Sequence, residues 1–192
     1  FRFLWTKKNP RDFARRIVMA TEAPGNFLYG LPDRLGIDDE IAALGDYIYR
    51  LGLGKNPKPF LLVDGVKMML QQLQSHYPMA VVSARGERST HWFLKQFELT
   101  HLFETVVTAQ TCQYTKPYPD PIQWAAKKMG VLPNECLMIG DTTVDILAAK
   151  AANAQSAAVL CGFGERDELD AAGADIILDN TKDITKILLP KE

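Results

Sequence analysis

The sequence predicts an α/β fold in which a parallel β-sheet carries helices on both faces. Beyond residue 60, short apolar runs of strand length alternate with segments whose apolar residues recur at helical spacing. The chain is also long enough to bury a core, with 192 residues of which 47% are hydrophobic. This alternation favours parallel strands joined by helices over an all-α or all-β fold.

The first 59 residues are predicted to form a separate helical unit. Apolar residues recur at helical spacing in residues 13–20 and again in residues 41–51. Residues 52–59 then collect glycine, proline and lysine, a composition that favours an exposed, extended connection. We therefore expect two domains, a helical one over residues 1–59 and an α/β one over residues 60–192.

Within the second domain the elements follow in regular order. Apolar periodicity predicts helices over residues 64–76, 87–97, 121–129 and 144–152. Short apolar runs predict strands over residues 79–82, 105–108, 136–139, 157–160 and 175–178. Ligands of such sheets bind at the carboxyl ends of the strands, so polar residues that directly follow a strand are the first candidates for chemistry.

Composition excludes several classes of partner. The 22 basic and 23 acidic residues give a net charge of −1 and form no long runs of one sign, which argues against nucleic acid and membrane partners. No apolar run approaches the roughly 20 residues that span a bilayer. The three cysteines, Cys112, Cys136 and Cys161, form no CxxC pair. We expect a cytoplasmic protein with a small-molecule partner, and the sequence indicates no oligomeric state.

Two carboxylates follow the strand predicted over residues 136–139. Asp141 and Asp145 lie four positions apart, directly after Gly140. Carboxylate oxygens can supply part of the shell of Mg²⁺, which keeps several waters and takes further oxygens from a phosphate substrate. The alternative is a helix N-cap, in which Asp141 or Thr142 accepts hydrogen bonds from free backbone amides. The pattern alone does not separate the two.

Two further candidates follow the first two predicted strands. Ser83, with the backbone of Ala84 and Arg85, can hold phosphate oxygens, although a serine here is also typical of a simple turn or helix cap. Lys116 lies in a loop stiffened by three prolines, Pro117, Pro119 and Pro121. A rigidly presented ammonium suits a phosphoryl group, whereas a single lysine is more often solvated surface.

The order of these residues resembles the motifs of the haloacid dehalogenase superfamily. Ser83 matches the second family motif, Lys116 in its Lys-Pro-x-Pro context matches the third, and Asp141 with Asp145 matches the fourth. Residues 162–169 and 172–175 also look like the tail of phosphoglycolate-phosphatase-like members. The resemblance implies a Rossmann-like core with a small helical cap, and it makes residues 1–59 the remainder of that cap.

One family motif is missing. The first motif is a strand that ends in Asp-x-Asp, where the first aspartate attacks phosphorus and the second acts as general acid and base, and no Asp-x-Asp occurs in this chain. Since the family's first strand lies centrally in the sheet, we expect a core that lacks its central strand. The chain begins with Phe1, and we expect the motif to lie upstream of it in the native protein, so that this chain alone is inactive.

With the motif supplied, the resemblance implies a magnesium-dependent phosphatase of a small phosphorylated metabolite. The phosphoryl group would pass to the missing aspartate and then to water, with Mg²⁺ and Lys116 stabilising charge and Ser83 holding oxygens. Asp141 would act with Lys116 in catalysis and with Asp145 at the metal, and Ser83, Ala84, Arg85 and Lys116 would bind substrate. The absent motif motivates the alternative, a catalytically inactive ligand-binding or regulatory protein on the same fold.

Overall fold

The computed structural model describes residues 60–189. Its strands are all parallel and form two sheets. Strand β1 (Ala80–Val82) pairs with β2 (Thr105–Val107), and the second sheet has the order β3 (Leu137–Gly140), β4 (Gln155–Val159), β5 (Ile176–Leu178). The predicted strands are therefore confirmed, within two residues at each end. The cap expected over residues 1–59 lies outside the described residues.

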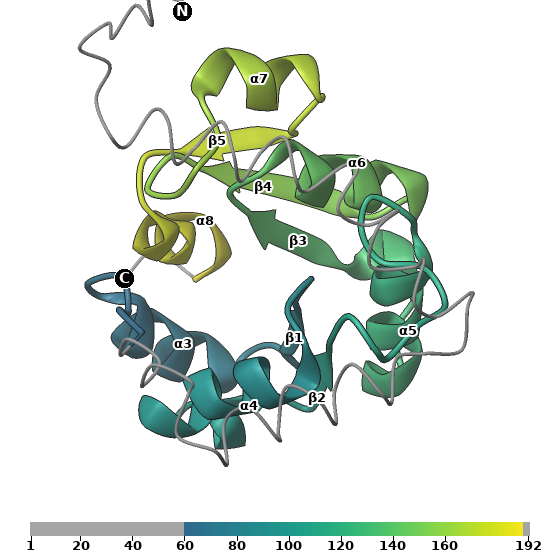
Figure 1. The fold of residues 1–192 in the computed structure, drawn as a ribbon. Coiled ribbons are helices and arrows are strands. Elements are labelled where there is room, and N and C mark those ends of the chain that lie inside the picture. The colour runs from purple at the N-terminus through teal and green to yellow at the C-terminus, as the bar shows by residue number, and fades with distance from the viewer. Residues whose placement is uncertain (1–59, 190–192) are drawn as a thin grey trace, which may run out of the picture.

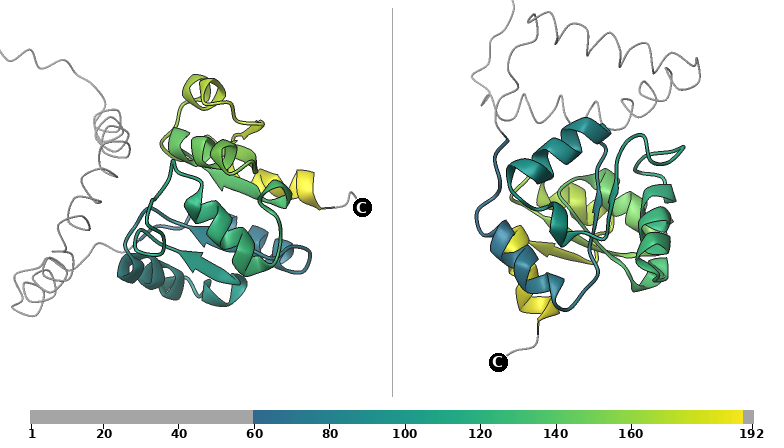
Figure 2. Two further views of the ribbon diagram at one scale, coloured as in Figure 1. Left: turned by 90° about the vertical axis from the view of Figure 1, so that its right-hand side faces the viewer. Right: turned by 90° about the horizontal axis from the view of Figure 1, so that it is seen from below.

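Helices lie on both sides of the strands, as the alternation predicts. In Figure 1, α3 and α8 lie on one side and α5 and α6 on the other. Both views of Figure 2 keep the yellow α8 near the blue α3, and the two helices are in contact. The helix bounds are α3 Val66–Gln74, α4 Glu87–Gln96, α5 Asp120–Met129, α6 Thr143–Ala151, α7 Arg166–Ala171 and α8 Thr185–Leu188. Short 3₁₀ turns span Thr100–Leu102, Pro133–Glu135 and Thr181–Ile184.

The structure confirms the α/β class but divides the sheet. Within residues 60–189, β1 is paired only with β2, and β3 is paired only with β4. Figure 1 shows these two strands at the facing edges of the two sheets. This division agrees with the sequence prediction of a core that lacks a central strand.

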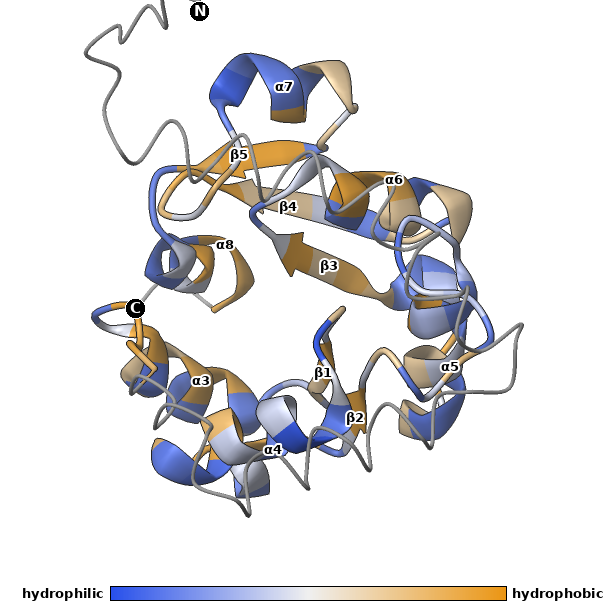
Figure 3. Ribbon diagram, viewed as in Figure 1, coloured by the Kyte–Doolittle hydropathy of each residue, from blue (hydrophilic) through white to orange (hydrophobic). Residues whose placement is uncertain are grey.

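The core packs against both faces of β4. Side chains of consecutive strand residues point to opposite faces of the sheet, so Ala157 and Ala158 face opposite sides. Ala157 packs with Met69 and Leu73 of α3 and with Ile184, whereas Ala158 packs with Ile146 of α6 and Leu169 of α7. The apolar colouring of β3 and β5 between more polar helices follows the same pattern (Figure 3).

Two positions show why particular residues end or begin these helices. Gly65 precedes α3 with φ 79°, and Asn153 follows α6 with φ 59°. Glycine enters this left-handed region freely and asparagine tolerates it. No helix within residues 60–189 is long and apolar enough to cross a bilayer.

Candidate active site

Lys116 and Asp145 form a buried ion pair. Lys116 lies in the loop between β2 and α5, and Asp145 lies in the first turn of α6, directly after β3. They are 8% and 3% exposed, and the Lys116 ammonium donates a hydrogen bond to Oδ1 of Asp145. The loops that follow β2 and β3 therefore meet, so the carboxyl ends of strands from both sheets lie at one edge of the molecule. The surface interpretation of Lys116 is wrong.

Asp145 also caps the helix on which it lies. Its Oδ2 accepts hydrogen bonds from the backbone amide of Thr142 at 3.1 Å and from the Thr142 hydroxyl at 2.9 Å. Because Oδ1 contacts Lys116, both oxygens of Asp145 have partners within the protein. The cap interpretation thus applies to Thr142 and Asp145, and a metal-ligand role for Asp145 stays a prediction.

Asp141 is held by a different loop. Its Oδ2 accepts a hydrogen bond from the amide of Phe163 at 2.8 Å, and its carbonyl oxygen accepts one from the amide of Gly164 at 2.8 Å. A Cβ atom at Gly162 would overlap the Asp141 side chain. The loop after β4 therefore closes around Asp141, and glycine at position 162 is what allows this approach.

Burial disfavours the ionised form of Asp141. Desolvation raises the pKa of this carboxyl above its ordinary value, and the amide of Phe163 opposes that rise. The nearby Asp145 carboxylate raises the pKa further, whereas the Lys116 ammonium lowers it. A partly buried carboxylate that is costly to ionise gains most from a cation beside it.

Ser83 forms a tight turn at the end of β1. Its amide donates to the carbonyl of Val107 at 2.9 Å, which continues the pairing of β1 with β2. Its hydroxyl oxygen accepts a hydrogen bond from the amide of Arg85 at 3.1 Å. Ala84 and Arg85 are exposed at this turn. The turn interpretation of Ser83 is confirmed, and its role in phosphate binding stays a prediction.

A hollow of about 650 Å³ lies at the carboxyl ends of β3 and β4. Asp141 is in its wall, and the residues around it are mostly apolar or small: Leu61, Val63, Ile139, Gly140, Val159, Cys161, Gly162, Phe163 and Thr181. Neither Lys116 nor Ser83 lines it. Among the predicted site residues, the structure therefore joins Lys116 to Asp145 and places Asp141 at the hollow.

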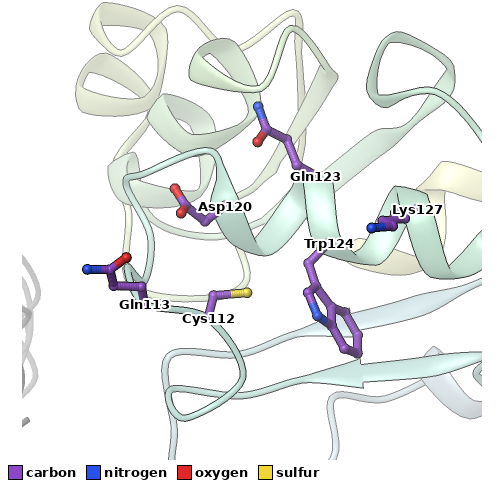
Figure 4. A pocket seen from close by; sticks show the side chains of 6 residues that line it. All are labelled: Cys112, Gln113, Asp120, Gln123, Trp124 and Lys127. Carbon is purple, nitrogen blue, oxygen red and sulfur yellow. The ribbon is translucent and has the colours of Figure 1, made fainter.

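A smaller hollow of about 330 Å³ lies beside α5 (Figure 4). It is lined by Cys112, Gln113, Asp120, Gln123, Trp124 and Lys127. None of the predicted site residues belongs to it, and we assign it no function.

Sequence reasoning missed the loop that holds Asp141. Gly162 and Gly164 were noticed only as part of the family's tail. A stronger signal was available, because a glycine pair directly after an apolar strand is typical of a close backbone approach. Within residues 60–189 no cluster of three or more His, Cys, Asp or Glu side chains could hold a metal, so the described part offers at most part of a metal shell.

Comparison with known proteins assigns the family. Residues 34–159 match the family of haloacid dehalogenase-like hydrolases. The chain belongs to this family. In this chain Lys116, which follows β2, forms its ion pair with Asp145, the second of the two aspartates that follow β3.

Relatives of this haloacid dehalogenase-like chain are named as phosphatases. It is 32% identical to a pyrophosphatase PpaX of Oceanobacillus iheyensis over 120 residues, which are 62% of this chain and 56% of that protein. It is also 32% identical to a phosphoglycolate phosphatase of Aliivibrio fischeri over 128 residues, which are 66% of this chain and 56% of that protein. The chain thus spans about half the length of these relatives.

Solved structures show the same fold. A predicted phosphoglycolate phosphatase from Haemophilus somnus aligns with TM-score 0.63 and 30% identity, covering 66% of this chain and 57% of that one. A hydrolase from Pseudomonas syringae aligns with TM-score 0.61 and 29% identity, covering 67% and 62%. The parallel α/β core of the haloacid dehalogenase fold is therefore common to all three chains.

Proposed function

We propose that this protein is a magnesium-dependent phosphatase of small phosphate esters that works through an aspartyl-phosphate intermediate. The observation that carries the proposal is the buried ion pair between Lys116 and Asp145, because it brings a cation to the strand ends beside Asp141. The names of the relatives, pyrophosphatase and phosphoglycolate phosphatase, support hydrolysis of small phosphorylated molecules, and the second name supports a phosphate ester.

Each residue has a distinct role in this proposal. Ser83 and the amides of the turn after it hold oxygens of the phosphoryl group. The Lys116 ammonium neutralises charge that develops on those oxygens as the group is transferred. Asp145 is a positioning residue, since it fixes the ammonium while its second oxygen is bound to Thr142.

Asp141 fits Mg²⁺ as one ligand among several. Burial disfavours its ionised form, so a cation beside it relieves an electrostatic cost. Magnesium binds through one or two carboxylates and completes its shell with waters and substrate phosphate, so Asp141 need supply only part of that shell. When bound, the ion neutralises charge on the transferred phosphoryl group.

The nucleophile belongs, in this proposal, to a segment N-terminal to Phe1. An aspartate there attacks phosphorus, the bond from phosphorus to the leaving oxygen breaks, and the second aspartate of the motif gives that oxygen a proton. Water activated by the same second aspartate then cleaves the aspartyl-phosphate and releases inorganic phosphate.

The test is phosphate release by the protein expressed from its complete natural gene. With Mg²⁺ present, we expect turnover of a phosphate ester such as phosphoglycolate, and Lys116→Ala lowers it by about 10²–10³-fold because a preorganised positive charge is lost. Lys128→Ala is the matched control, since Lys128 is an exposed lysine of α5 whose ammonium lies 5.1 Å from the Trp124 ring centroid. Equal turnover in both variants would contradict the proposal, and ligand binding without turnover would favour the inactive scaffold.

A further inference from the structure

Arg85 is held beside the Ser83 turn by an aromatic ring. Its guanidinium carbon lies 5.3 Å from the ring centroid of Phe60, within the range of a cation–π contact. Its backbone is fixed on both sides, because its amide donates to Ser83 Oγ at 3.1 Å and its carbonyl accepts from the amide of Ala109 at 3.0 Å. Hydrogen bonds thus hold the backbone of Arg85, and the Phe60 ring holds its guanidinium.

Phe60 is itself fixed against helix α4. Its ring makes edge contacts with Trp92 and Phe93, at centroid distances of 5.2 Å and 5.4 Å. The side-chain amide of Gln96 donates to the Phe60 carbonyl at 3.1 Å. Two ring contacts and one backbone hydrogen bond, all from α4, therefore hold Phe60 beside Arg85.

Arg85 is an exposed cation in the turn that follows β1 and Ser83. Leu61, which directly follows Phe60 in the chain, lines the hollow that contains Asp141. Within residues 60–189 no salt bridge of Arg85 to a carboxylate is found. An arginine fork that is oriented but not neutralised by a neighbouring acid suits an anionic ligand, because it can bind a carboxylate or phosphate through two hydrogen bonds.

We propose that Arg85 binds a second anionic group of the substrate, a carboxylate or phosphate on the leaving group, and that Phe60 is its positioning residue. The inference rests on the proposed phosphatase function, because Ser83 must hold the phosphoryl group that is transferred. Arg85, two residues further along the same turn, then contacts the part of the substrate that leaves. Phosphate esters with an uncharged leaving group gain nothing from it.

A binding experiment tests this without requiring turnover. The protein from the complete gene is titrated calorimetrically, with Mg²⁺ present, with methylenediphosphonate and with methylphosphonate, two non-hydrolysable ligands that differ in the second anionic group. We expect tighter binding of methylenediphosphonate, and Arg85→Gln removes about 10–100-fold of that preference because charged hydrogen bonds are lost. Lys95→Gln, which removes an exposed positive charge from the same region, keeps the preference.

Phe60 variants separate positioning from general damage to the fold. Phe60→Leu lowers the preference by about 2–5-fold, the worth of an exposed cation–π contact. Phe60→Tyr keeps an aromatic face and restores the preference. Binding of methylphosphonate stays the same in both, which a merely unfolded variant would not show.

The outcomes decide between the two proposals. The inference is overturned if the parent protein shows no preference for methylenediphosphonate, or if Arg85→Gln keeps that preference. Either result counts against it even if the enzyme turns over substrate. A preference that depends on Arg85 without any turnover supports the inference and counts against the phosphatase. If Arg85→Gln loses the preference for methylenediphosphonate but Phe60→Leu keeps it, the positioning role of Phe60 is overturned.

Discussion

The ammonium of Lys116 and the carboxylate of Asp145 contact each other although 29 positions separate them in the chain. The contact is buried, with side chains 10% and 5% exposed. It joins the loop after β2 to the helix after β3, and so it links two sheets that share no strand pairing in the described residues. The pair is thus structural as well as part of the proposed active site.

Replacing Asp145 tests that structural role. Asp145→Asn leaves the Lys116 ammonium buried without this carboxylate, and breaking such a pair costs about 3–5 kcal/mol in the free energy of unfolding. Glu98→Gln, which removes the exposed ion pair with Lys67 at 3.1 Å, is the control and costs less than about 1 kcal/mol. Urea unfolding measures both. Equal losses in the two variants would show that the buried pair adds no stability of its own.

Gly162 permits the close approach of its loop to Asp141. In Gly162→Ala the new Cβ overlaps the Asp141 side chain, and shifting the loop costs about 1–3 kcal/mol. Gly86→Ala is the matched control, because a Cβ there meets only the Gln110 side chain, at 3.4 Å. Thermal unfolding compares the two variants. A Gly162→Ala protein as stable as the parent would mean that the loop does not close on Asp141 in solution.

The hydrogen bonds of Asp175 predict that the stability of the fold depends on pH. Its Oδ2 accepts hydrogen bonds from the Ser156 hydroxyl and amide, both at 2.7 Å, and these lower the pKa of Asp175 below its ordinary 3.8. A depressed pKa means that the carboxylate stabilises the fold above pH 3.8, and that this contribution is lost as pH falls through the folded-state pKa. The contribution therefore belongs to the neutral and mildly acidic range.

Asp175→Asn should remove this stabilising contribution of the carboxylate. At neutral pH we expect a loss of about 1–2 kcal/mol, at the low end for charged hydrogen bonds because Asp175 is exposed. Urea unfolding at a series of pH values should show the gap between parent and variant closing in acid. Asp179→Asn, which removes an exposed pair with Arg166 at 3.2 Å, serves as the control. A gap that widens in acid would refute the assignment.

How far the sequence predicts this molecule differs between fold and site. The strands that contain Val81, Val106 and Ile139 follow from short apolar runs, since local pattern decides where a buried strand forms. Helix α7 was not predicted, because its six residues, Arg166–Ala171, carry too little apolar periodicity to signal a helix. The split of the sheet was expected only through the missing family motif.

In the candidate site, the residues could be predicted from the sequence, but their contacts could not. Residue types and order pointed to Ser83, Lys116 and Asp141, but not to the contacts that fix them. The bond between Asp141 and the amide of Phe163 joins residues 22 positions apart, and nothing in local periodicity encodes it. The spacing of Asp141 and Asp145 indicated one pair of carboxylates, whereas tertiary contacts give the two residues different partners.

Magnesium binding should depend on Asp141. A ligand that binds only the native state raises the melting temperature, so Mg²⁺ should raise that of the protein expressed from its complete gene. Asp141→Asn should lose most of this rise because a carboxylate ligand is gone. Asp170→Asn, on the exposed part of α7, should keep it. An unchanged rise in Asp141→Asn would remove Asp141 from the metal site.

The most direct measurement traps the covalent intermediate. The protein from the complete gene is incubated with substrate and Mg²⁺, reduced with borohydride, and mapped by peptide mass spectrometry to find the aspartate that carried the phosphoryl group. We predict a single reduced aspartate, the first of an Asp-x-Asp pair N-terminal to Phe1. Turnover with the label on a residue of these 192, or with no trapped aspartate, would contradict the account.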